Sequence, residues 1–262
     1  MHCYNISPPP ALQQLINGIW VVEVGDAIPQ PERMIPFGCM DLVFYRNGQA
    51  KKIHMDGTQQ KLSAAMIFGQ TITPYWLQLS PGMTVLGVGF LPHTAHLLTK
   101  SSSKAFTDQS IGLSDVLGEK MAQWSRDITA ASTTEEAIML LQRALISAIS
   151  SSFPHRNQAY LNHLLRSIIL QKGNIDLTLL ARYAGVSLRY VEKLFQEFVG
   201  LRPGQFCRVQ RFLHATQTVD QYPSLTELAL ACGYFDQSHF IREVRRFTHL
   251  SPKQYFAEQK QM

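Results

Sequence analysis

The feature that most constrains this chain is a repeat in its C-terminal half. The segment Leu177–Ala181, with Gly185 after it, matches Leu225–Ala229 with Gly233 at an offset of 48 residues. After the glycine the offset becomes 49, a one-residue difference within the turn. The later matching pairs are Val191 and Phe240, Lys193 and Arg242, Phe198 and Phe247, Leu201 and Leu250, Pro203 and Pro252, and Phe206 and Tyr255. Two copies of one supersecondary unit are therefore present.

Each copy has the pattern of a helix, a tight turn and a second helix. Gly185 and Gly233 stand where such a turn needs the left-handed backbone conformation. The residues placed to cap the helices are Asp176, Ser187, Ser224 with Glu227 in a capping box, and Asp236. This pattern predicts two helix-turn-helix units, each with a second helix that fits the major groove of DNA.

Further helices are predicted around the repeat. A helix that precedes it has an apolar face and ends at Gly173-Asn174, and a longer helix joins the two copies and carries Arg208 and Arg211. The apolar residues of these two helices are Leu161, Leu164, Leu165 and Ile168, and then Phe206, Val209 and Leu213.

The basic charge lies entirely in this part of the chain. The whole sequence carries a net charge of +5. Residues 1–154 have 10 Lys or Arg and 11 Asp or Glu, a net charge of −1, and residues 155–262 have 14 and 8, a net charge of +6. A basic module beside a neutral one indicates a polyanion-binding domain attached to a second domain, although +6 alone is also compatible with chance surface charge.

Length and composition fit a globular protein of two domains. The chain has 262 residues, of which 45% are hydrophobic. Its four cysteines are widely spaced, so we expect neither a disulfide framework nor a cysteine-rich zinc site. The start has no secretory signal and no apolar run is long enough to span a membrane, so we expect a cytoplasmic protein.

The first hundred residues predict strands at 18–24, 40–46, 49–55, 64–69, 75–79 and 85–91, in a small barrel or sandwich. Asn47-Gly48 is a preferred type I′ hairpin pair, so 49–55 is expected to return antiparallel to 40–46. Gly87 and Gly89 share one face of their strand and permit another element or a ligand to approach closely.

Helical spacing follows the strands. Ser114 is predicted to cap a helix that continues to about Arg126. Ser132 and Glu135 form a capping box for the next helix. That helix has one apolar face, which packs within the chain or on a second copy. The residues of this face are Ile138, Leu141, Leu145 and Ile149.

Residues 157–258 resemble the DNA-binding domain of the AraC/XylS family of bacterial transcription regulators, over about 40% of the chain. The motifs that carry the resemblance are Leu180-Ala181, Gly185, Ser187, Leu194-Phe195, Gly200, Pro203, Arg211-Phe212, Ala215, 228–234, 236–240, Arg242, Ser251-Pro252 and Tyr255. The sequence departs from the family pattern at Val244, His249 and Phe256. A non-glycine residue such as His249 in the left-handed conformation costs roughly 1 kcal/mol.

The N-terminal part resembles, less specifically, a β-rich domain that precedes this module in some family members. The motifs are 38–42, 88–92, 106–108 and Leu113. The resemblance implies a sensing or dimerising role without naming a ligand. We therefore expect an α+β chain of three parts: a β-rich sensing or dimerisation domain with C-terminal helices (1–152), a linker (153–156) and an all-α twin helix-turn-helix domain (157–258).

Carried over by position, the outward faces of the two recognition helices supply the candidate DNA contacts. Arginine can bind guanine through two hydrogen bonds and glutamine can pair with adenine. Arg211 and Arg246 are expected to hold phosphates or to form internal ion pairs. The candidate DNA-binding residues are Ser187, Arg189, Glu192, Lys193, Gln196, Arg208, Gln237, Ser238, Ile241, Arg242 and Arg245.

Two classes of function remain open. The first is a one-component regulator that binds double-stranded DNA and recruits or blocks RNA polymerase, in which a small-molecule effector binds the aromatic residues of the strands and a homodimer is possible. The second is a cupin-like metal-dependent enzyme that uses His93 and His96 and is fused to a DNA-binding module. No catalytic motif is present, so we predict the regulator, without enzyme activity, metal or cofactor. The candidate effector residues are Trp20, Phe44, Tyr75, Trp76 and Phe90.

Overall fold

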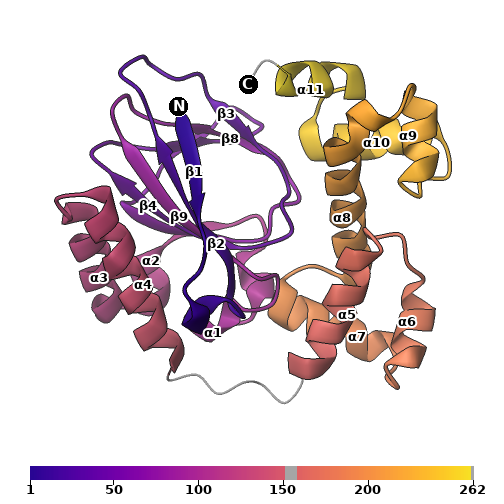
Figure 1. The fold of residues 1–262 in the computed structure, drawn as a ribbon, viewed down its shortest axis with the longest axis horizontal. Coiled ribbons are helices and arrows are strands. Elements are labelled where there is room, and N and C mark those ends of the chain that lie inside the picture. The colour runs from indigo at the N-terminus through magenta and orange to yellow at the C-terminus, as the bar shows by residue number, and fades with distance from the viewer. Residues whose placement is uncertain (151–157, 261–262) are drawn as a thin grey trace.

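The computed structural model describes residues 1–150 and 158–260. Residues 1–150, here called the β domain, contain two antiparallel sheets (Figure 1). The six-stranded sheet has the order β1 (His2–Ile6), β2 (Ile16–Glu23), β9 (Thr84–Phe90), β4 (Asp41–Arg46), β7 (Ala65–Phe68) and β10 (Ser110–Gly112). The four-stranded sheet has the order β3 (Glu32–Met34), β8 (Tyr75–Gln78), β5 (Lys51–Ile53) and β6 (Gln59–Lys61). Over the described residues neither sheet closes into a barrel. Of the two folds expected from the sequence, a barrel or a sandwich, the sandwich is therefore the correct one.

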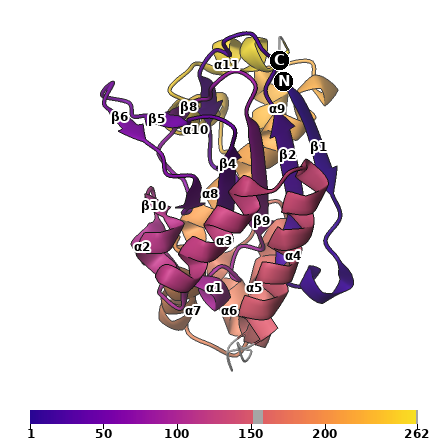
Figure 2. The ribbon, with the colours of Figure 1, turned by 90° about the vertical axis from the view of Figure 1, so that its left-hand side faces the viewer.

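Side chains alternate between two cores along the central strands. On β4, Leu42 and Phe44 belong to the core between the larger sheet and the helices, whereas Val43 and Tyr45 belong to the core between the two sheets. The helices that cover the outer face are α3 (Glu119–Ala130) and α4 (Thr134–Ser150), which cross in front of the larger sheet in Figure 2. The short elements beside them are η1 (Pro10–Leu12), α1 (His96–Thr99), η2 (Ser103–Phe106) and α2 (Leu113–Leu117).

The hairpin predicted from Asn47-Gly48 is wrong. Asn47 does turn the chain with a φ of 57°, but Gly48 has no positive φ, so this is not a type I′ turn. β4 pairs with β7 and β9, while β5 pairs with β6 and β8 in the other sheet. The turn residues determine the local geometry alone. Because β4 is buried from Leu42 to Arg46, it lies inside the larger sheet and pairs with β7 and β9 instead.

Two helix boundaries of the β domain also differ from expectation. The helix predicted over 114–126 is two helices, because Gly118 between α2 and α3 has a φ of 72°. The cap of α4 is Thr133, whose Oγ1 accepts from the Glu136 N–H at 3.1 Å, one residue later than predicted. Leu141 and Leu145 are buried against the sheet, as expected for packing within the chain. The side chain of Ile149 and the predicted linker 153–156 lie outside the described parts.

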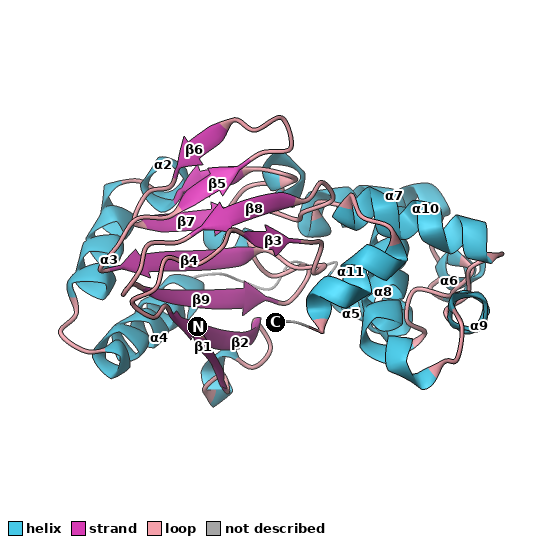
Figure 3. Ribbon diagram, turned by 90° about the horizontal axis from the view of Figure 1, so that it is seen from above, coloured by secondary structure: helices cyan, strands magenta, loops and turns pink. Residues whose placement is uncertain are grey.

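Residues 158–260, here called the helical domain, contain α5 (Gln158–Leu170), α6 (Leu177–Tyr183), α7 (Leu188–Leu194), η3 (Phe195–Val199), α8 (Pro203–Thr218), η4 (Val219–Gln221), α9 (Leu225–Ala231), α10 (Gln237–Thr248) and α11 (Pro252–Gln259). Figure 3 shows all the helices of this domain on one side of the strands. One apolar core runs through both copies of the repeat. Phe212 of α8 lies 5.2 Å from Phe247 of α10, between ring centres. The two units are therefore packed together by the long helix that joins them.

Candidate DNA-binding interface

The four predicted helix caps of the repeat are confirmed. Asp176 accepts hydrogen bonds from two backbone N–H groups at the start of α6, and Ser187 accepts from the Tyr190 N–H of α7 at 3.2 Å. Ser224 caps α9 through the Glu227 N–H, and Asp236 caps α10 through the His239 N–H at 2.6 Å. Each cap satisfies backbone donors that have no partner inside the helix. These caps define where each recognition helix begins.

The two turns also take the predicted conformation. Gly185 has a φ of 69° and Gly233 a φ of 77°, both in the left-handed region that favours glycine. Their surroundings differ: a Cβ on Gly233 would lie 2.5 Å from the Asn174 side chain, whereas nothing lies within 4 Å of one on Gly185. His249, after α10, has a φ of 58°, so a non-glycine residue does occupy the left-handed position there. The turns therefore place α7 and α10 in the positions predicted for the recognition helices.

Most predicted DNA contacts lie on exposed faces of these helices. Gln196 is half-buried and lies in η3, beyond the end of α7, and Ile241 is half-buried on α10. Gln237 Oε1 accepts a hydrogen bond from Thr226 Oγ1 at 3.0 Å, which orients its amide. The exposed members of the predicted set are Ser187, Arg189, Glu192, Lys193, Gln237, Ser238, Arg242 and Arg245. Because these side chains are exposed, a bound macromolecule can reach them. Their contact with DNA stays a prediction.

Arg208 has a partner inside the protein that the sequence did not reveal. Its Nε and one Nη donate to the two carboxylate oxygens of Glu243 on α10, each at 2.6 Å. Glu243 is 4% exposed, and this pairing raises the pKa of Arg208. Arg211 donates to the Gly233 carbonyl at 3.1 Å and lies over the Tyr234 ring. Both arginines therefore connect α8 to the second unit, whatever further contact they make.

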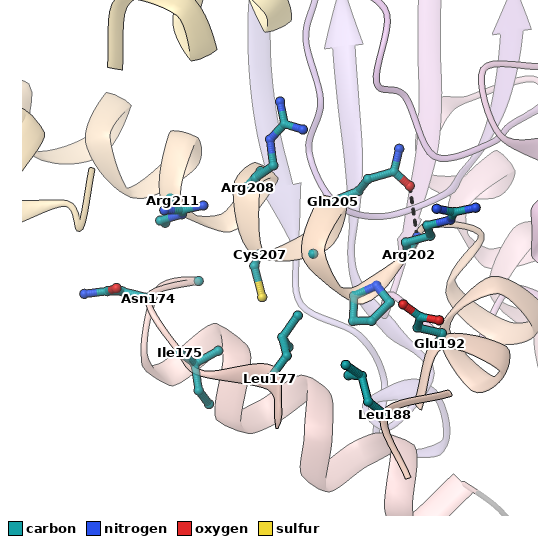
Figure 4. A pocket seen from close by; sticks show the side chains of 13 residues that line it. Asn174, Ile175, Leu177, Leu188, Glu192, Arg202, Gln205, Cys207, Arg208 and Arg211 are labelled. Carbon is teal, nitrogen blue, oxygen red and sulfur yellow. Dashed lines mark hydrogen bonds between the residues drawn. The ribbon is translucent and has the colours of Figure 1, made fainter. Parts of the chain in front are cut away.

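A cleft of about 490 Å³ lies between the first unit and α8 (Figure 4). Leu188 and Glu192 of the first recognition helix line one wall, and Arg202, Arg208 and Arg211 line the wall formed by α8. Arg202 is exposed. Guanidinium groups in such a cleft favour an anionic ligand, and a DNA phosphate is one. The cleft widens the candidate interface beyond the two recognition helices.

The predicted effector residues lie in three places of the β domain. Phe44 and Phe90 are buried in the core beneath the helices. Tyr75 lies between the sheets, and Trp20 lies on the same side across Gly87, where a Cβ would come within 2.1 Å of the indole. Trp76 instead stacks against the Arg33 guanidinium, 4.9 Å from its ring centre. The close approach expected at Gly87 is that of Trp20, and the five residues do not share one wall.

Polar groups between the sheets were missed by the sequence reasoning. Burial raises the pKa of Asp41 to about 6. Hydrogen bonds from Trp20 and Cys39 act in the opposite direction and lower this pKa, but by less than burial raises it. Within the described parts, the Tyr45 hydroxyl and the Gln70 amide are buried without a hydrogen-bond partner. The one available signal was the carboxylate of Asp41 at the start of a strand whose next four residues, 42–45, are hydrophobic. Buried groups of this kind are expected to bind water or a polar ligand.

His93 and His96 lie on successive turns of one short segment. His96 Nδ1 is 2.6 Å from the His93 carbonyl oxygen, and burial lowers the pKa of His93 to about 4. Among the described residues, no group of three or more His, Cys, Asp or Glu side chains is placed to hold a metal ion. This pair alone is not a metal centre.

Comparison with known proteins agrees with this geometry. Residues 180–258 match a family model described as a helix-turn-helix domain, and residues 4–112 match one described as a domain of unknown function, DUF6597. The HTH-type transcriptional regulator GbdR of Pseudomonas aeruginosa is 34% identical over 80 residues, which are 30% of this chain and 22% of GbdR. The regulator ArgR of the same species is 26% identical over 149 residues, 53% of this chain and 45% of ArgR. The chain thus spans less than half the length of these two relatives.

Among solved structures, ToxT from Vibrio cholerae is 9% identical with a TM-score of 0.48, covering 90% of this chain and 95% of ToxT. Two capped helix-turn-helix units joined by one long helix define the class of this protein. Within that class, its helix-turn-helix domain is similar to those of HTH-type transcriptional regulators such as GbdR. In the part of the chain that the structure describes, no helix is both long and apolar enough to cross a membrane.

Proposed function

We propose that this protein is a sequence-specific DNA-binding transcription regulator of the one-component type. The observation that carries the proposal is the pair of capped recognition helices, each with an exposed polar and basic face. Two such helices in one chain fit two successive segments of the major groove. The net charge of +6 over residues 155–262 supports attraction to phosphate.

The β domain is proposed to bind a small-molecule effector. The buried polar groups near Asp41 and Tyr45 favour a ligand with hydrogen-bonding groups over a wholly apolar one. A homodimer, contact with RNA polymerase and a cytoplasmic location complete the proposal by family resemblance. We propose no enzyme activity, and no observation specifically favours the metal-enzyme alternative.

The experiment that tests DNA readout is the substitution Arg242→Ala. Arg242 is exposed on α10, opposite the buried Phe240 and Phe247. We expect loss of about 1–3 kcal/mol of discrimination between a selected operator and a scrambled duplex, because a two-pronged contact with a base is removed. Binding curves on both duplexes at two salt concentrations measure it, and Lys253→Ala on exposed α11 is the control. Equal weakening on both duplexes would mean that Arg242 contacts phosphate alone.

A further inference from the structure

We propose that the β domain controls DNA binding by donating hydrogen bonds to the C-terminal ends of both recognition helices. This inference rests on the proposed function and names how that function is regulated. The last carbonyls of any helix have no partner within it and need donors from elsewhere. In this protein the described side chains that reach these carbonyls include residues from two separate segments of the β domain.

The first contact is made at the end of the first recognition helix, where α7 continues into η3. Ser103 Oγ, fully buried, donates to the Phe198 carbonyl at 2.9 Å, and Thr107 Oγ1 donates to the Gly200 carbonyl at 2.7 Å. Gly200 has a φ of 88°, and a Cβ there would lie 2.8 Å from the Ser103 carbonyl oxygen. The glycine thus permits the close approach of the β domain to this helix end.

The second contact is made at the end of the second recognition helix. Arg33 Nη1 donates at 2.7 Å to the carbonyl of Thr248, the last residue of α10. The other Nη lies 3.4 Å from a carboxylate oxygen of Glu258 on α11, and the Arg33 side chain is 17% exposed. A cation at a helix C-terminus is also favoured by the helix dipole. Arg33 therefore binds both the last turn of α10 and the helix that follows.

The two contacts lie far apart on the helical domain: the first follows α7, which is low in Figure 1, and the second is at the end of α10, which is near the top. Between them, Gly38 packs on α8, where a Cβ would lie 2.7 Å from the Gln210 side chain. The β domain contacts the C-terminal ends of both recognition helices. A conformational change in the β domain therefore alters how well ordered both helix ends are. Trp76, the candidate effector residue that stacks on Arg33, also pairs with it across β3 and β8. An effector near Trp76 would reach α10 through a single side chain.

The test uses the full chain and a duplex selected by it from random sequence, with each half-site scrambled in turn. The half-site read by α10 is the one whose scrambling removes the effect of Arg242→Ala. We expect Arg33→Ala to bind the intact duplex about fivefold to tenfold more weakly than the unchanged protein does. On the duplex whose α10 half-site is scrambled, the two proteins should have the same affinity. Ser103→Ala with Thr107→Ala should give the same pattern for the other half-site. Non-additive losses of this kind are the sign of coupling.

Arg33→Lys keeps the charge and should lose less, and Lys51→Ala, an exposed lysine of β5, is the matched control and should lose nothing. Amide exchange should quicken over residues 245–249 in Arg33→Ala while α5 stays protected, which separates helix fraying from global unfolding. Unchanged binding, tighter binding or equal losses on both half-sites would overturn the inference. Failure of the unchanged protein to select any sequence would instead overturn the proposed function.

Discussion

The ion pair between Arg208 and Glu243 gives a predicted DNA contact a role inside the protein. Glu243 lies on the second recognition helix but is 4% exposed, so its carboxylate depends on the two hydrogen bonds from Arg208. A buried carboxylate without a partner is strongly unfavourable. Arg208 is a candidate DNA contact from its position in the sequence, and the structure adds a structural role that spacing alone could not reveal.

Arg208→Ala is therefore expected to destabilise the helical domain by about 3 kcal/mol, since it leaves Glu243 buried and unpaired. Urea denaturation measures the loss. The double change Arg208→Ala with Glu243→Gln should recover most of it, because the neutral amide has no charge to bury. If the slope of log affinity against log salt concentration is still shallower by about one unit in the double variant, Arg208 also contacts phosphate. A stable Arg208→Ala protein would contradict the structural role.

Two titratable groups of the β domain, one buried and one half-buried, act in opposite directions as pH falls. Burial lowers the pKa of His93 to about 4, so the unfolded chain takes up this proton first and stability is lost between about pH 6.5 and 4. Burial raises the pKa of Asp41 to about 6, so the native state takes up that proton first and stability is gained between about pH 6 and 4. Over that shared range the two contributions largely cancel.

Removing either group should reveal the other. On acidification from pH 7.5 to 4.5, Asp41→Asn is expected to lose about 2 kcal/mol more of its free energy of unfolding than the unchanged protein. His93→Gln should lose about 2–3 kcal/mol less than the unchanged protein over the same range. Urea denaturation at four pH values measures both. Parallel curves for all three proteins would show that neither group has its pKa shifted by folding.

At the scale of elements, local chemistry predicted the helical repeat better than the sheets. Caps such as Asp176 and Asp236 act within one turn, so the sequence was sufficient to place α6 and α10. Strand pairing depends on partners distant in the chain, which is why β4 and β5 were wrongly joined. The short strands β1, β3, β6 and β10 were missed, since each carries few buried residues from which a period could be recognised.

The turn glycines allow a direct comparison of the two units. Gly233→Val is expected to cost more stability than Gly185→Ala, because it combines a positive φ, β-branching and a collision with Asn174. Gly185→Ala has free space and should cost about 1 kcal/mol from its backbone conformation alone. Thermal melts of both variants measure the order. A larger loss for Gly185→Ala would contradict the description of these turns.

At the scale of the molecule, the sequence predicted the order of the parts but not how they meet. The basic excess and the repeat both identified the helical domain, because each is a property of a continuous segment. The contacts of Arg33 and Ser103 with distant carbonyls have no sequence signal, since their partners are backbone atoms 95 to 215 residues away. The sequence also could not predict that the aromatic effector candidates lie in three places. An alternating strand pattern shows that two faces differ, but not which core each face packs against.

The central claim is that both recognition helices read DNA together. Hydroxyl-radical footprinting of the full-length protein on a duplex that it selects from random sequence tests this most directly. The account predicts two protected segments one helical turn apart on one face of the duplex, with the second lost in Arg242→Ala and the first retained. It also predicts that affinity falls steeply with salt, because bound phosphates release counterions. A single protected segment, or protection that does not depend on sequence, would contradict it.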